Sequence, residues 1–165
     1  MEIEQLRKHL TQQADWAAAC LEADLLAIPE EKRTSTFGGC SRAALSIVGD
    51  CCQSNKGTAA WLMTGTAPPR DPDARAKRDA EYDTAEKMLV WLHSSMAELR
   101  AANAALQEHN LFETSTEVIG APLTRLQVAE LASRHMMHHD AQLNYIQCLL
   151  GDGAMHWPVE KLRNG

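Results

Sequence analysis

Long apolar runs, strand-like alternation and basic charge are all scarce in this 165-residue sequence. No apolar stretch approaches the about 18 residues that a membrane-spanning helix needs, and the acidic, polar start predicts no signal peptide. We therefore expect a cytoplasmic protein without membrane contact. Asp and Glu outnumber Lys and Arg by 22 to 16, and the basic residues are scattered, which argues against nucleic-acid binding. β-Branched residues seldom alternate with polar ones, which favours an all-α fold.

The cysteine pattern argues against a disulfide scaffold. The five cysteines are an odd number, and no two of them form a CxxC pair. In a cytoplasmic protein, thiols of this kind stay reduced. We expect most of them to be small apolar residues of the core.

Apolar residues at helical spacing predict four long helices in one domain spanning residues 1–165. The predicted helices are Ile3–Ala27, Ser41–Met63, Asp71–His109 and Thr124–Leu150. Pro29, Gly65 and Gly151 are helix-stop signals, and Thr124 with Gln127 forms a capping-box pattern at the start of the last helix. Four amphipathic helices pack most simply as a four-helix bundle, here with a long crossover between the second and third.

The last predicted helix contains the strongest chemical signal. His135 and His139 lie four residues apart in the middle of its apolar stripe, so their side chains stack on one face and can chelate a metal ion. Two core histidines that only bond their neighbours remain the alternative. Met136 stands where zinc peptidases of the HExxH type carry their general base, which disfavours peptidase chemistry. His138 points away from the stripe and is interpreted as a flank residue.

A metal ion bound by two histidines needs a third protein ligand from another helix. Asp50 lies in the middle of the second predicted helix, in an apolar neighbourhood where a carboxylate is costly unless it is paired or bound to a metal. A surface carboxylate on a rotated helix is the alternative. Cys51 is the next candidate ligand, and His93 in the third helix is a weaker one.

The motif His135-Met-Met-His-His139-Asp-Ala-Gln142-Leu resembles the last helix of DinB-like (YfiT-like) proteins. The resemblance extends to Phe37-Gly-Gly and Ser41-Arg before the second helix, and to Gly120-Ala-Pro before the last. It implies a four-helix bundle with a long crossover, often a homodimer, which binds one divalent metal ion. The third ligand in that family is usually histidine, and the corresponding position here is Asp50. Zinc, nickel, iron and manganese all fit two histidines and a carboxylate.

The resemblance implies a metal-dependent hydrolase or a thiol-dependent transferase that acts on a small molecule. Asp50, His135 and His139 would hold the metal, while Gln142, Tyr145 and His138 would support the ligands or contact the substrate. The alternative is a non-catalytic bundle that binds a ligand or partner and has a degenerate or structural metal site.

Overall fold

A computed structural model of the protein describes residues 2–66, 68–69, 71–114 and 121–160. These residues form α-helices and two short 3₁₀ turns, and within them no strand occurs beyond one isolated antiparallel bridge between Thr114 and Thr124. The helices are α1 (Ile3–Ala27), α2 (Ala44–Thr64), α3 (Ala74–Glu81), α4 (Ala85–Ala105) and α5 (Arg125–Leu149), and the 3₁₀ turns are Glu30–Lys32 and Glu108–Asn110. The predicted all-α fold is confirmed.

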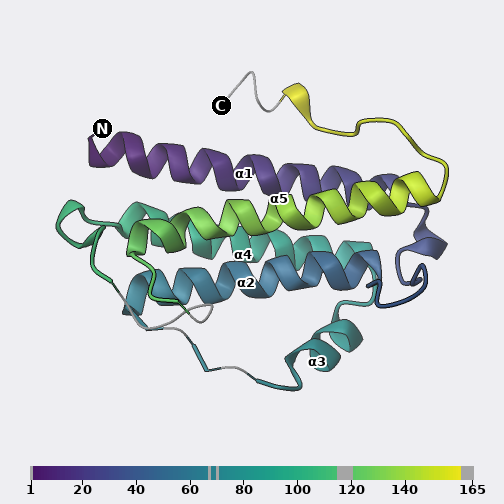
Figure 1. Cartoon of the computed structure of the whole chain (residues 1–165), viewed down its shortest axis with the longest axis horizontal. Helices are drawn as coiled ribbons and strands as arrows, with labels where there is room; N and C mark the ends of the chain where they lie inside the picture. Colours follow the sequence, from purple (N-terminus) through teal and green to yellow (C-terminus); the bar gives the residue numbers. More distant parts are fainter. Residues whose placement is uncertain (1, 67, 70, 115–120, 161–165) are drawn as a thin grey trace.

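The four long helices form a bundle, with α3 on its outside (Figure 1). α1 and α5 run in one direction, and α2 and α4 run in the other. α2 packs most extensively against α4, and α1 against α5. Because α2 and α4 are parallel, the chain between them has to return along the whole bundle, and this return is the predicted long crossover. Part of the predicted connections, namely Ala67, Arg70 and residues 115–120 with Gly120, lies outside the described residues.

The prediction of one continuous third helix from Asp71 to His109 is wrong. The chain forms α3 and α4 there, separated at Tyr82, and it leaves the helical conformation again at Leu106. The break has a local cause, since the hydroxyl of Thr84 accepts the backbone N–H of Lys87 at 3.3 Å and so caps a new helix. The first helical residue also differs from the prediction, since α3 begins at Ala74 and not at Asp71.

The other helix ends agree closely with the prediction. α2 ends at Gly65 (φ +78°), and Gly151 (φ +88°) follows α5, both in the left-handed region that favours glycine. Thr124 and Gln127 exchange the two hydrogen bonds of a capping box. α2 begins at Ala44 rather than Ser41, since the Ser41 hydroxyl accepts the N–H of Phe37 at 2.7 Å and belongs to the preceding turn.

The core is built from apolar side chains of all four long helices, including the fully buried Trp61, Leu21, Leu92 and Leu143. None of the five cysteines forms a disulfide bond, and three of them are buried. None of the described helices is long and apolar enough to cross a membrane. α5 packs against both α1 and α2 and therefore buries residues on two of its faces. Both sites discussed below lie on this helix.

Candidate metal centre

Three side chains from α2 and α5 converge on one point. The Nε2 atoms of His135 and His139 lie 3.1 Å apart. Oδ2 of Asp50 lies 3.3 Å from Nε2 of His139 and 4.0 Å from Nε2 of His135. The one-turn spacing in α5 stacks the two imidazoles, and α2 brings the carboxylate to them. The structure thus brings together the three residues that the sequence analysis named as metal ligands.

These distances fit a small divalent ion. In a tetrahedral site with bonds of about 2.1 Å, neighbouring ligand atoms are roughly 3.4 Å apart. The three separations of 3.1, 3.3 and 4.0 Å bracket that value. Two imidazole nitrogens at 3.1 Å also repel one another unless a proton or a cation lies between them. The donor set of two nitrogens and one carboxylate oxygen suits zinc, nickel, iron or manganese.

Cys51 offers a second route to a three-ligand set. One ligand atom each from Cys51, His135 and His139 lie within 4.8 Å of one another. Burial, followed by the neighbouring Cys52, raises the pKa of the Cys51 thiol well above its usual value. A metal ligand must be a thiolate, so binding here would first have to remove this proton. Asp50 is already ionised, which favours the carboxylate as the third ligand.

Gln142 sets the orientation of His139. Its Oε1 lies 2.9 Å from Nδ1 of His139. When Nδ1–H donates to this oxygen, the lone pair of Nε2 faces His135 and Asp50. A hydrogen bond on the far side of a ligating imidazole is the usual arrangement around protein-bound metals. The structure therefore places Gln142 beside His139, and its support of a metal ligand stays a prediction.

The protonation states also suit metal binding. Burial, followed by the neighbouring His139, lowers the pKa of His135 to about 4, so this imidazole is neutral at pH 7. Without a metal ion, Nε2–H of His139 donates to Asp50, and this hydrogen bond, together with Arg42, holds the pKa of Asp50 well below its usual range despite partial burial. One neutral imidazole and one carboxylate are thus ready to coordinate a cation without losing a proton.

Arg42 and Arg78 complete the site, and sequence reasoning did not single them out as functional. Nη1 of Arg42 donates to Oδ2 of Asp50 at 2.9 Å, and Nη2 lies 3.3 Å from Oε1 of Gln142. Nη1 of the buried Arg78 lies 3.5 Å from Oδ1 of Asp50. Arg78 comes close because residue 49 is glycine, where an added Cβ would lie 2.9 Å from Cδ of Arg78.

The remaining candidates lie at the edge of the site or away from it. Nε2 of His138 is 3.4 Å from Nε2 of Gln142, and its exposed ring stands beside that of His139. The side chain of Tyr145 is 65% exposed on the outer surface of α5. His93 pairs with Glu22 at 3.0 Å, on a different surface of the bundle. The structure therefore brings His138, but neither Tyr145 nor His93, to the two histidines.

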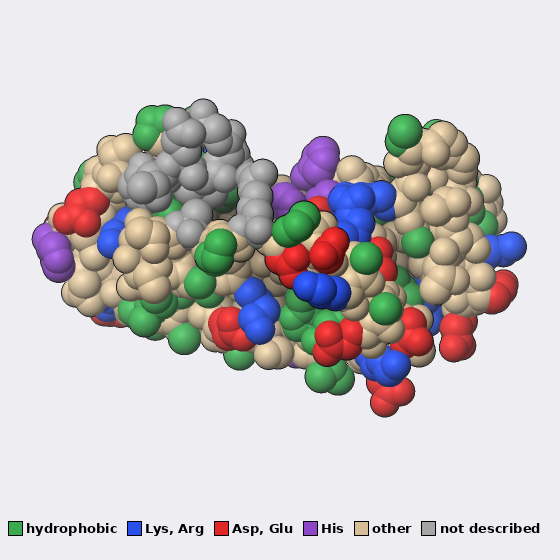
Figure 2. All heavy atoms as spheres, turned by 90° about the horizontal axis from the view of Figure 1, so that it is seen from below, with side chains coloured by type: hydrophobic (Ala, Val, Ile, Leu, Met, Phe, Trp, Pro, Cys, Tyr) green, Lys and Arg blue, Asp and Glu red, His purple; other side chains and the backbone are tan. Residues whose placement is uncertain are grey.

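The site is open to small molecules. The side chains of Asp50, His135 and Arg42 are 33%, 28% and 22% exposed. On the face of the molecule that carries α2 and α3, histidine side chains lie next to basic and acidic ones (Figure 2). The site is therefore partly accessible to solvent.

Comparison with solved structures decides the fold class. The structure is similar to the crystal structure of the DinB-like protein YjoA from Bacillus subtilis, with a TM-score of 0.63 and 17% sequence identity over 92% of this chain and 94% of that one. The chain has the DinB-like fold. No protein-family model and no curated protein matches the sequence. The fold that the resemblance implied is thus confirmed, and the structural similarity extends over nearly the whole chain.

Proposed function

We propose that this DinB-like protein binds one divalent transition metal ion through Asp50, His135 and His139 and is a metal-dependent enzyme. The observation that carries the proposal is the convergence of Oδ2 of Asp50 with the two Nε2 atoms at 3.1–4.0 Å. Three protein ligands would leave further coordination positions open, as catalytic sites require.

The proposed reaction is hydrolysis of a small molecule or transfer of a thiol to it. A metal ion held here would lower the pKa of water or of a thiol, which is chemistry that both reactions share. The protein's own side chains determine what else can bind. Arg42 presents a guanidinium beside the ligands, suited to an anionic group of the substrate. His138 is the nearest exposed imidazole and could accept or donate a proton at the rim of the site.

One observation favours the alternative of a non-catalytic binding protein. Arg42 donates to Oδ2 of Asp50, the same oxygen that faces the histidines. The guanidinium of Arg42 thus already balances the negative charge of the Asp50 carboxylate, which a metal ion would otherwise do. In this alternative the cluster of Arg42, His139 and Gln142 binds an anionic ligand without a metal ion. The predicted homodimer and cytoplasmic location stay predictions.

Metal analysis of matched variants tests the proposal. The wild-type protein is stripped, reloaded separately with zinc, nickel, manganese and ferrous iron, and analysed for bound metal. We expect about one equivalent of at least one metal in the wild type, and less than about a tenth in Asp50→Ala, His135→Ala and His139→Ala. His93→Ala and Asp83→Ala, which remove an exposed histidine and an exposed aspartate elsewhere, should keep the full equivalent.

Cys51→Ala separates the two ligand sets. If it keeps the metal while Asp50→Ala loses it, Asp50 is the third ligand; the reverse result would assign that role to Cys51. A wild type that binds none of the four metals contradicts the proposal and leaves the binding-protein alternative.

The metal-loaded protein is then assayed for hydrolysis of chromogenic esters and for thiol addition to a chromogenic electrophile, with His135→Ala as the inactive control.

A further inference from the structure

A second buried polar cluster lies on the other side of α5, where the helix faces α1. Asp24 of α1 is fully buried, and Asp140 of α5 is 2% exposed. Among the described residues, no Lys, Arg or His lies within ion-pair distance of either carboxyl group. Buried carboxyl groups without a cation are costly, and natural proteins retain them where they have a use.

The two acids have different neighbours. Oδ2 of Asp24 accepts a hydrogen bond from Nδ2 of Asn144 at 2.7 Å, and Oδ1 accepts one from Nε2 of Gln147 at 3.2 Å. Oδ1 of Asp140 has no hydrogen-bond partner among the described residues. Asp24 is therefore satisfied by the protein, whereas Asp140 carries an unused acceptor.

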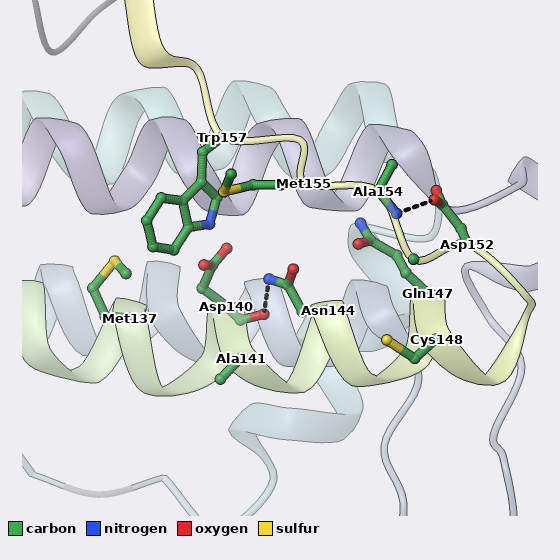
Figure 3. A pocket seen from close by; sticks show the side chains of 11 residues that line it. Met137, Asp140, Ala141, Asn144, Gln147, Cys148, Asp152, Ala154, Met155 and Trp157 are labelled. Carbon is green, nitrogen blue, oxygen red and sulfur yellow. Dashed lines mark hydrogen bonds between the residues drawn. The ribbon is translucent and has the colours of Figure 1, made fainter.

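The side chain of Asp140 lines a cavity of about 410 Å³ between α5 and the segment of residues 152–157 that follows it (Figure 3). Asp140, Asn144 and Gln147 form its polar floor, and Met137, Met155 and Trp157 line its apolar walls. The ring of Trp157 packs edge-on against that of Trp16 at 6.1 Å, which holds this wall against α1. A volume of this size is within the range of small-molecule sites.

We propose that this cavity binds a small organic cation, namely a primary ammonium group attached to an aromatic body. The ammonium donates to Oδ1 of Asp140 and faces the negative charge that Asp140 shares with Asp24. The aromatic body lies against Met137 and the indole of Trp157, whose face also attracts cations. A bare metal ion fits less well, since the only three-ligand group among the described residues is the one at His135 and His139. The proposal is independent of the metal centre.

Three probes of similar shape and different charge test this inference: 2-phenylethylamine, 2-phenylethanol and 3-phenylpropionate. Calorimetric titration of the wild type should show saturable binding of the amine, at least about tenfold weaker binding of the alcohol and none of the carboxylate. Asp140→Asn keeps the shape of the side chain and should weaken amine binding at least about tenfold. Asp83→Asn, which changes an exposed carboxylate on another surface, should bind the amine like the wild type.

Two further variants keep the test decisive. Trp157→Ala removes a 40% exposed side chain from the cavity wall and should weaken amine binding even if Asp140→Asn fails to fold. His135→Ala should leave amine binding unchanged, and a loss in that variant would place the amine at the metal centre and overturn the inference. Equal affinity for amine and alcohol, or full amine binding by Asp140→Asn or by Trp157→Ala, would also overturn it.

Discussion

The side of α5 that faces α2 and the side that faces α1 both bury polar groups, but they balance charge in opposite ways. On the first, Asp50 lies between two guanidiniums and two imidazoles. On the second, Asp24 and Asp140 lie beside the amides of Asn144 and Gln147 and the indole of Trp157. On the first side the carboxylate is paired with guanidinium groups, and Arg42 suits an anionic substrate beside a metal ion. The second has an excess of negative charge and suits a cation.

Among the residues that surround the proposed ligands, Gln142 should have the largest effect on metal binding. Gln142→Leu removes the acceptor for Nδ1 of His139, so the imidazole is no longer oriented toward the metal. Loss of such a supporting hydrogen bond typically weakens metal affinity by about 10- to 100-fold, and we expect a decrease of that size in a competition titration with a zinc chelator. Asn144→Ala, on the opposite side of the helix, is the control and should bind zinc like the wild type. An unchanged affinity in Gln142→Leu would show that Gln142 does not orient His139.

Arg42 should act in the opposite direction. Its guanidinium competes with a metal ion for Oδ2 of Asp50, so Arg42→Gln should tighten zinc binding by about tenfold, or about 1.4 kcal/mol. Asp50 stays ionised in this variant, since the hydrogen bond from His139 is the main cause of its low pKa. Arg100→Gln removes an arginine that pairs with Asp15 on the surface and serves as the control. Weaker zinc binding in Arg42→Gln would mean that Arg42 supports the carboxylate rather than competing for it.

The parts of the structure that follow from local signals could be predicted from the sequence. Gly65, Gly151 and the Thr124–Gln127 capping box determine helix ends within a few residues. The four-residue spacing of His135 and His139 determines that they share a face. The helix break before Thr84 could not be predicted in this way. Apolar residues at helical spacing predict a helix in this region, and the cap that starts α4 depends on a single threonine hydroxyl group.

The contacts that depend on how helices pack could not be predicted in this way. Arg42 lies in the segment before α2, where no helical periodicity indicates the direction of its side chain. Its guanidinium contacts His139, which is 97 positions away in the sequence. Asp24 and Gln147 meet across 123 positions. The sequence analysis also assigned α5 one buried stripe, whereas the helix buries a second one against α1. Asp140 was therefore overlooked as a candidate for binding.

The smallest expected effect compares the two acids of the α1-facing side. Burial, followed by the hydrogen bond with Asp24, raises the pKa of Asp140 to about 8, so folding has to keep this carboxyl group protonated at pH 7. Asp140→Asn replaces it by an amide that is neutral at every pH and can donate to Asp24, so the free energy of unfolding should rise by about 1 kcal/mol. Asp24→Asn should lower it by a similar amount, since the new amide would set a donor against Nδ2 of Asn144 or Nε2 of Gln147. For a chain of this length, 1 kcal/mol corresponds to a change of about 2–4 °C in the melting temperature, measurable by calorimetry. Asp83→Asn, at an exposed position that pairs with Lys87, should change the free energy of unfolding little. Opposite signs for the two buried positions would show that the protein itself satisfies Asp24 and leaves Asp140 available to a ligand; equal losses would mean that both carboxylates serve the packing of α1 on α5.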